Sequence, residues 1–336
     1  MKKKNKAIYL LFLMPFVYFA TACFVVWLVK TSGIYPSGSD TMYHVYRGDY
    51  VYNAIKSGNW YPLYDPAWYN GVEILRYWSP FPAYVMAFCQ YLAGGSQFGA
   101  YLFYIGGVCF LGACVWPFIG RGFNRPYLGA FIGLLWFFIP NNLCAIFIEG
   151  NLARSLSMIF LPVFIYSVYK YLYNHKLRYI PLMVFTFLLM ELCHLGYAGM
   201  AAIAVIIYGI VYMIQKGRKK AVLDVVISMI FGFMLLGIWL VASLRGGITS
   251  LDNSENMANF FQNLWITINP FERLTRGFEY FYFGFAALVV IVFGILFGYK
   301  KSRTGFVTGF IILLMTTKSA YAVLKHLPGS QYLWMF

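Results

Sequence analysis

The sequence has few charged residues, and this scarcity excludes most soluble proteins. Only 11% of its 336 residues are charged and only 11 residues are Asp or Glu, whereas 61% are hydrophobic. A soluble domain usually has about 25% charged residues, which cover its water-facing surface. We therefore expect most of this chain to contact lipid instead of water.

The sequence also lacks the cysteine patterns of metal-binding and disulfide-bonded proteins. It contains no C-x-x-C pair and no histidine cluster beside a cysteine. The six cysteines all lie in apolar segments, at Cys23, Cys89, Cys109, Cys114, Cys144 and Cys193. Free cysteine in such surroundings behaves as a small apolar residue. We expect these side chains to pack in the protein interior.

No basic stripe interleaved with exposed aromatic residues is present, although the net charge is +15. The cations instead form short clusters between apolar runs. Such clusters are typical of the cytoplasmic loops of a membrane protein. Nucleic acid is therefore not an expected partner.

Apolar runs long enough to cross a bilayer recur along the chain, beginning with residues 7–29. A hydrocarbon core of about 30 Å requires about 20 helical residues. The first run follows four lysines, as a signal peptide would, but it is too long for the apolar core of one. The segment Ala20–Cys23 is also a poor lipobox. We interpret this run as a retained anchor.

A short apolar segment, residues 81–93, decides on which side of the membrane the later loops lie. Its 13 residues suit a re-entrant or interfacial helix better than a span. If it does not cross, 16 of the 26 Lys and Arg lie on the cytoplasmic side together with the N-terminus; if it crosses, only 10 do. The first arrangement obeys the positive-inside rule, and we adopt it.

The predicted fold is an all-α, polytopic transmembrane bundle that forms a single membrane domain over residues 1–336. Residues 31–97 are expected to form an outer loop with short interfacial or re-entrant helices, and residues 245–278 a second outer loop. The nine expected spans are about 7–29, 98–120, 126–144, 152–172, 178–194, 196–215, 221–244, 279–299 and 304–321. The expected location is a bacterial cytoplasmic (inner) membrane, with several crossings and the N-terminus in the cytoplasm. Since the sequence stops at Phe336 without a polar tail, we expect a truncated chain.

A short helix is predicted at the start of the first outer loop. Ser39 or Asp40 can cap a helix that runs to about Ser57 and stops at Gly58. At 3.6 residues per turn, Asp40, His44 and Arg47 lie on one stripe, which would present three polar groups at the membrane surface. An ordinary interfacial helix can show the same triplet by chance, so both interpretations stay open.

The segment 37–82 resembles the first outer loop of GT-C glycosyltransferases. It has an Asp just beyond the first span, a helix with His and Arg, a G-x-W-Y-P turn, an aromatic loop and an x-P-x-P-x-Y helix. Within that superfamily it is similar to bacterial 6-pyruvoyl-tetrahydropterin synthase-related membrane proteins, whose name describes no pterin chemistry evident in this sequence. The resemblance continues at residues 149–154, 193–195 and 327–331.

The resemblance implies that a sugar carried on a polyprenyl phosphate is transferred to an envelope acceptor on the outer face, as by a hexosyltransferase. Asp40 matches the acid that acts as general base or metal ligand, and a carboxylate can take the proton of an attacking hydroxyl. The catalytic candidates are Asp40, His44 and Glu149. The substrate-binding candidates are Arg47, Asp49, Arg154, Glu191, His194 and Arg245. Guanidinium groups suit phosphate because they form bidentate hydrogen bonds.

A metal site is doubtful, because Asn151 stands where metal-dependent relatives carry the second acid of a pair. No other cofactor is expected. Glu149 can instead stabilise the N-terminus of the following helix, and Glu191 and His194, three residues apart, can form an interhelical hydrogen bond. Two other functions stay open: a transporter or flippase of lipid-linked sugar, and a non-catalytic scaffold in envelope biogenesis.

Overall fold

The computed structural model describes residues 2–36, 38–68, 70–245, 285–315 and 317–326. In these ranges the regular structure is helical, apart from one isolated bridge between Asp65 and Val72. This confirms the predicted all-α class. The expected second outer loop beyond Arg245, the first part of the expected span 279–299 and the motif at 327–331 lie outside the described residues.

The chain divides into two compact units. Unit 1 comprises residues 1–198 and 228–246, and unit 2 comprises residues 199–227 and 247–336. Unit 1 holds α1 (Lys2–Ser32), α2 (Thr41–Lys56), α3 (Ile74–Tyr77), α4 (Phe81–Leu92), α5 (Gln97–Gly122), α6 (Pro126–Leu135), the 3₁₀ turn η1 (Trp136–Phe138), α7 (Pro140–Leu143), the π-helical turn η2 (Cys144–Ile148), α8 (Leu152–Asn174), α9 (Tyr179–Cys193) and α12 (Gly237–Arg245). The helices α10 (Leu195–Lys216) and α11 (Lys219–Leu235) each contribute to both units, and unit 2 also holds α16 (Phe285–Met315) and α17 (Lys318–Leu324).

Four helices of the described part are long and apolar enough to cross a membrane: α1 from Phe12 onward, α5, α8 and α10. The number rises to six if two bent pairs each count as one span. One pair joins residues 126–138 to 141–148 with a bend of 46°, and the other joins α11 to α12 with a bend of 65°. The chain is thus a multi-pass membrane protein by the length and composition of its helices.

The other expected spans correspond to shorter helices. The 15 residues of α9 rise only about 22 Å, less than a hydrocarbon core of about 30 Å. The helix α16 has a non-helical residue, Ser302, at φ −121°, which divides it into two shorter apolar segments. Length therefore supports four to six spans, a coarser statement than the nine expected from apolar runs.

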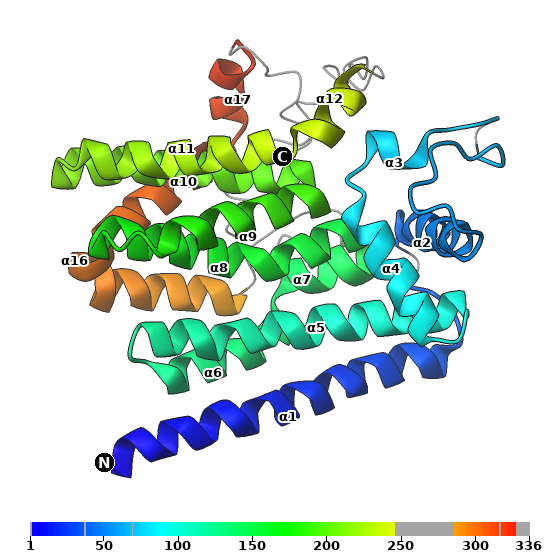
Figure 1. The fold of residues 1–336 in the computed structure, drawn as a ribbon. Helices are drawn as coiled ribbons and strands as arrows, with labels where there is room; N and C mark the ends of the chain where they lie inside the picture. Colours follow the sequence, from blue (N-terminus) through cyan, green and yellow to red (C-terminus); the bar gives the residue numbers. More distant parts are fainter. Residues whose placement is uncertain (1, 37, 69, 246–284, 316, 327–336) are drawn as a thin grey trace. The chain divides into compact units, whose positions relative to one another are not determined.

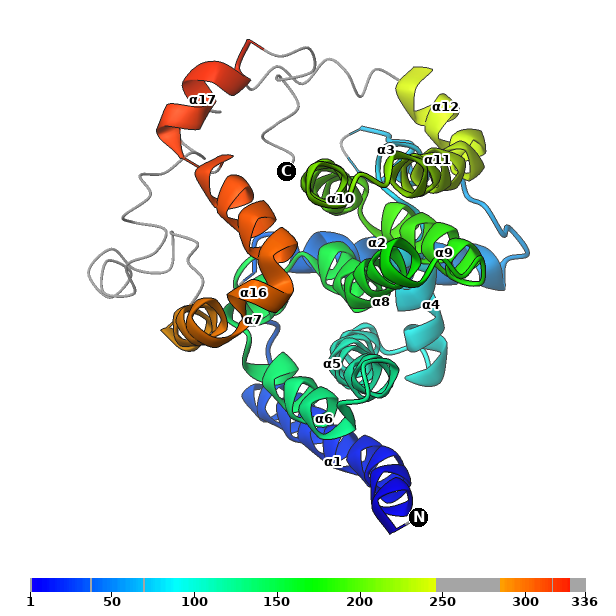
Figure 2. The same ribbon diagram turned by 90° about the vertical axis from the view of Figure 1, so that its left-hand side faces the viewer.

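The core of unit 1 is built around α5. Both ribbon views show α1 and α6 beside α5 (Figures 1 and 2), and these helices contact one another. The hydroxyl of the fully buried Tyr18 donates to the carbonyl of Ala130 at 2.8 Å, and Tyr104 donates to Leu152 at 2.8 Å. Interhelical hydrogen bonds of this kind contribute about 0.6 kcal/mol on average in membrane proteins. The second bond fixes the start of α8 against α5.

Four of the six cysteines are buried, as expected, but the expectation that Cys23 is buried is wrong. It lies exposed on α1, which is the least buried of the four long apolar helices. A helix that faces lipid on most sides can place an apolar residue outward without exposing it to water.

The bounds of the predicted helix after Asp40 are confirmed by α2, which begins at Thr41 and ends just before Gly58, where φ is +86°. Asp40 is at the N-cap position, but its side chain forms no capping hydrogen bond, so the predicted cap is wrong in this respect. It packs against α4 and approaches it closely, since a Cβ on Gly48 would lie 2.2 Å from the Met86 side chain. The 12 residues of α4 rise about 18 Å, too little for a span. Both helices contact α5, and together they hold the segment around Asp40 in place.

Helices of unit 2 contact one another through a hydrogen bond and through a close approach at a glycine. The hydroxyl of the buried Thr304 donates to the Gln215 side chain at 2.7 Å. A Cβ on Gly209 would lie 2.9 Å from Val222, so α10 and α11 approach each other closely at this glycine. Small residues at helix contacts are typical of membrane bundles.

Candidate functional site

Three segments of unit 1 that are distant in sequence meet at one end of α8. The backbone N–H of Asp40 and the hydroxyl of Ser39 both donate to the carbonyl of Glu149 at 3.0 Å. Gly150 allows this approach: its φ is +66°, and a Cβ there would lie 2.2 Å from the Thr41 hydroxyl. The start of α2 and the loop before α8 are therefore joined directly.

We name the side chains gathered here the polar cluster. Its members come from the start of α2, from the turn before α8 and from the joint between α9 and α10: Asp40, His44, Glu149, Asn151, Arg154 and His194. Asp40 is exposed, Glu149, Asn151, Arg154 and His194 are half-buried, and His44 is buried.

Glu149 and Arg154 form an ion pair of 2.6 Å within the polar cluster. The side chains are 21% and 18% exposed respectively, so the pair is largely shielded from solvent. The Cys144 thiol lies 3.4 Å from the other carboxylate oxygen. Glu149 directly follows the π-helical turn η2, and its N–H donates to the carbonyl of Cys144 at 2.8 Å. Such turns are frequent at functional sites.

Asn151 has two roles. Its Oδ1 accepts a hydrogen bond of 2.9 Å from the backbone N–H of Arg154, so Asn151 is the N-cap of α8. This orientation directs the amide nitrogen Nδ2 toward His194, whose Nε2 is 3.3 Å away.

His194 shows which of its ring nitrogens carries the proton. Its Nδ1 accepts a hydrogen bond of 3.0 Å from the backbone N–H of Tyr197, so the ring is neutral and its proton is on Nε2. The Asn151 amide and the His194 Nε2–H are therefore two donors that face the same position. One oxygen of a phosphate or a sugar would satisfy both.

The expected exposed stripe on α2 is wrong beyond Asp40. His44 is only 9% exposed and Arg47 only 1%, because this face of α2 is turned toward the interior of unit 1. The Arg47 guanidinium donates to the carbonyls of Trp78 and Ser79 at 3.3 and 3.4 Å. It also lies 5.4 Å from the centre of the Tyr43 ring. Arg47 thus anchors the chain after α3 and has no contact that would place it at a phosphate.

Burial also changes the acid–base properties of His44. Desolvation, assisted by the positive charge of Arg47 and by His194, lowers the pKa of His44 from 6.5 to about 3. The imidazole is neutral near pH 7 and is a poor proton acceptor there. His44 is therefore the neutral, buried member of the polar cluster, and its catalytic role stays a prediction.

Glu191 and His194 do not share a helix face, contrary to expectation. The helix α9 ends at Cys193, and His194 has an extended backbone (φ −155°, ψ 99°), which turns its ring toward Asn151. Glu191 is 1% exposed, its carbonyl accepts from the Ser79 hydroxyl at 2.9 Å, and its Oε2 has no hydrogen-bond partner in the described part of the chain.

The two remaining substrate-binding candidates lie away from the polar cluster. The Asp49 carboxylate accepts a hydrogen bond of 2.6 Å from Gln90, which ties α2 to α4. Arg245 is the exposed last residue of α12, and no hydrogen bond or ion pair within the described ranges joins it to the polar cluster.

The polar cluster does not fit a divalent metal ion. Within the ranges that the structure describes, no group of three or more His, Cys, Asp or Glu is arranged as a metal site. The Glu149 carboxylate is already paired with the Arg154 cation, which would repel a metal ion at the same oxygens. Asn151 uses its only oxygen to cap α8.

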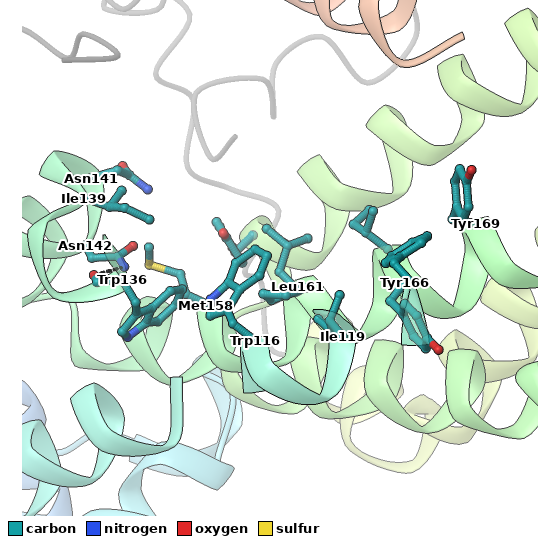
Figure 3. Close-up of a pocket in the computed structure, with 14 residues that line it drawn as sticks. Trp116, Ile119, Trp136, Ile139, Asn141, Asn142, Met158, Leu161, Tyr166 and Tyr169 are labelled. Atoms are coloured by element: carbon teal, nitrogen blue, oxygen red, sulfur yellow. Dashed lines mark hydrogen bonds between the residues drawn. The ribbon is translucent and has the colours of Figure 1, made fainter. Parts of the chain in front are cut away.

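An apolar cavity, which sequence reasoning missed, lies along α8. It has a volume of about 450 Å³, and its walls come from α5, α8, the bend after α6 and the start of α10. Figure 3 shows Asn141 and Trp136 toward one end and Tyr166 and Tyr169 toward the other. Tyr197 also lines the cavity, and its backbone N–H donates to His194, so one residue of the cavity wall contacts the polar cluster.

The sequence matches one protein family over most of its length. The model of a family described as "6-pyruvoyl-tetrahydropterin synthase related domain; membrane protein" matches residues 75–336. No curated protein and no solved structure matches the chain. The matched region contains Glu149, Asn151, Arg154 and His194, whereas Asp40 precedes it.

Proposed function

We propose, from the premise that the chain belongs to this family of membrane proteins, that it is a GT-C-like glycosyltransferase. It would move a sugar from a polyprenyl-phosphate donor to an envelope acceptor on the outer face of a bacterial inner membrane. The observation that carries the proposal is the pair of donors, Asn151 Nδ2 and His194 Nε2–H, beside the Arg154 cation. Such a set suits an oxygen of an anionic phosphate.

The proposed reaction assigns a separate role to Asp40. The acceptor hydroxyl attacks the anomeric carbon and forms the new C–O bond, while the bond from that carbon to the phosphate oxygen breaks. The electron pair leaves with the lipid phosphate, which Arg154 and the two donors stabilise. Asp40 takes the hydroxyl proton. Because Asp40 is exposed, an acceptor from solution can reach it.

The location of the polar cluster suits a lipid-linked donor. Asn151 is the residue before α8 and His194 the residue before α10, and both helices are long and apolar enough to span a bilayer. Polar groups at the ends of such helices lie at the level of lipid headgroups. A phosphate on a membrane-embedded chain would arrive at this level without leaving the bilayer.

A transfer assay with matched carboxylate variants tests this proposal. Purified protein is supplied with candidate polyprenyl-phosphate sugars, and transfer is compared for wild type, Asp40→Asn and Asp49→Asn. Loss of the general base is expected to lower the rate about 10²- to 10⁴-fold in Asp40→Asn. Asp49→Asn removes a carboxylate from the same helix but keeps an oxygen for Gln90, so it should transfer as the wild type does. Unchanged transfer by Asp40→Asn would refute the assignment.

The bent helix pairs favour a second candidate, a transporter or flippase of lipid-linked sugar. Discontinuous helices with bends of 46° and 65° are typical of transporters, in which broken spans line the substrate site. In that case the polar cluster binds the donor headgroup and no bond is broken. Translocation of a labelled lipid-linked sugar across reconstituted vesicles, without transfer, would support this candidate. Binding without either activity would favour a scaffold.

A further inference from the structure

A second group of cations lies at the other end of α8. The Lys170 ammonium donates to the carbonyl of Gly122 at 2.6 Å and lies 4.4 Å from the centre of the Phe123 ring. The Arg178 guanidinium donates to the Tyr179 hydroxyl at 3.1 Å. The rings of Tyr179 and Tyr166 meet edge to face, with their centres 6.1 Å apart. We name Lys170, Arg178, Tyr166 and Tyr179 the basic aromatic cluster.

The cations of this cluster have no carboxylate partner among the described residues. The ion pairs Glu73–Arg76 and Glu149–Arg154 involve neither Lys170 nor Arg178. An ammonium has three donors and a guanidinium five, so one hydrogen bond each leaves most of the donors of Lys170 and Arg178 available. The cluster therefore combines uncompensated positive charge with available donors, the properties that bind an anion.

The basic aromatic cluster borders the apolar cavity. Phe123 and Tyr166 contact the Lys170 ammonium through their rings and also line the cavity, as does Tyr169. Along α8 the cavity extends from Met158 to Tyr169, about 16 Å at the rise of an α-helix. The cations of the basic aromatic cluster therefore adjoin one end of an elongated apolar cavity.

We propose that the cavity and the basic aromatic cluster together bind an anionic phospholipid from the leaflet at the Lys170 end. One acyl chain occupies the cavity, and the phosphate accepts hydrogen bonds from Lys170 and Arg178. A zwitterionic headgroup would bring its own cation close to these two, so the charge favours a lipid with net negative charge. Free phosphate has no chain to fill the cavity. The site lies 16 positions along α8 from Arg154, and it does not depend on the proposed transferase activity.

The tryptophans of the cavity provide a direct probe of the acyl chain. Full-length protein is reconstituted in phosphatidylcholine vesicles that contain a small fraction of either phosphatidylglycerol or phosphatidylcholine with brominated chains. Bromine quenches nearby indole fluorescence, and Trp116 and Trp136 line the cavity. Subtracting the signal of the Trp116→Phe, Trp136→Phe double variant isolates quenching inside the cavity. Brominated phosphatidylglycerol is expected to quench this signal at about tenfold lower mole fraction than brominated phosphatidylcholine.

Charge variants then test the headgroup site. The double variant Lys170→Gln, Arg178→Gln should abolish the preference for phosphatidylglycerol. The control is Arg125→Gln, which removes an exposed cation just before α6 and should keep the preference. High salt should weaken the preference in the unmodified protein, a result that does not depend on how the double variant folds. Equal quenching by the two brominated lipids in the unmodified protein would overturn the proposal. A preference that survives in a folded double variant, or that Arg125→Gln removes equally, would overturn it too.

Discussion

The two ends of α8 differ in how their cations are compensated. At one end Arg154 is paired with a carboxylate, beside a neutral histidine and the exposed Asp40. At the other end Lys170 and Arg178 contact only a carbonyl, a phenol and aromatic rings among the described residues. A site that holds both signs of charge can bind an anion and also move a proton. A site with cations alone can bind an anion but has no base to accept a proton.

The largest expected effect is at the donor pair of the polar cluster. Asn151→Asp keeps an oxygen that caps α8 but replaces the Nδ2 donor with a negatively charged oxygen facing the His194 Nε2–H. If a phosphate oxygen binds between these groups, transfer should fall about 10²- to 10³-fold, as it does when a donor to a developing anion is removed.

The capping role of Asn151 is measured separately from its donor role. The melting temperature of Asn151→Asp in detergent should be at least that of the wild type, because aspartate is an equally good N-cap and its second oxygen can accept a hydrogen bond from the His194 Nε2–H. Asn151→Ser, which also caps but has a short hydroxyl, provides the control for helix stability. Equal transfer by Asn151→Asp and wild type would show that the two converging donors do not bind the substrate.

The next effect is on the backbone that brings the polar cluster together. Gly150→Ala introduces a Cβ about 2 Å from the Thr41 hydroxyl at a φ of +66°, and should destabilise the fold by roughly 2–4 kcal/mol. Gly58→Ala is the matched control, since its φ is +86° and a Cβ there would meet nothing within 4 Å. The free energy of unfolding of both variants is measured in detergent. The backbone strain is common to both, so the difference between them reports the lost contact between Gly150 and α2. Equal destabilisation would mean that the close approach contributes nothing.

Part of this site could be predicted from the sequence, and α2 shows which part. Asp40 as a cap and Gly58 as a stop are local signals, and they gave the bounds of the helix within one or two residues. The burial of His44 and Arg47 is not a local property. A face with an imidazole and a guanidinium looks solvent-exposed, and only the carbonyls of Trp78 and Ser79, about 30 positions further on, make its burial possible.

The joint at His194 and the apolar cavity show why the rest could not be predicted. The expected spans 178–194 and 196–215 place the joint within about one residue of its position, since α9 ends at Cys193 and α10 begins at Leu195. Helical spacing puts Glu191 and His194 on one face only if His194 is still helical, and its extended backbone is not a local signal of the sequence. The cavity is lined by residues such as Trp116 and Tyr169, which in a membrane helix look identical to lipid-facing ones. Which aromatic residues enclose a space depends on the bend after α6, where Ile139, the residue before a proline, has an extended backbone (ψ 120°). The proline signals a break in the helix, but it does not tell which side chains then face the cavity.

A smaller effect, on the pH dependence of stability, is expected from His44 within the polar cluster. Its pKa is about 3 in the folded protein and 6.5 in an ordinary setting, so below pH 6.5 the unfolded chain binds a proton that the folded protein excludes. Stability should therefore be highest above pH 6.5 and fall as the pH drops. Burial also lowers the pKa of His194, to about 4, so both imidazoles contribute to this fall. His44→Gln should reduce the slope without removing it, and the remaining slope is the contribution of His194. Parallel slopes for His44→Gln and wild type between pH 7 and 5 would contradict the burial argument.

The smallest effect is expected at the other ion pair of unit 1. Glu73 and Arg76 approach to 2.5 Å, slightly closer than Glu149 and Arg154, but their side chains are about one third exposed. Water screens such a pair, so Glu73→Gln should leave the melting temperature unchanged. Glu149→Gln, by contrast, leaves the Arg154 cation without its partner where less than one fifth of it is exposed, and should lower that temperature measurably. If the two variants melt alike, water screens the Glu149–Arg154 pair as it screens an exposed one, and the Arg154 cation would then contribute little to binding a phosphate.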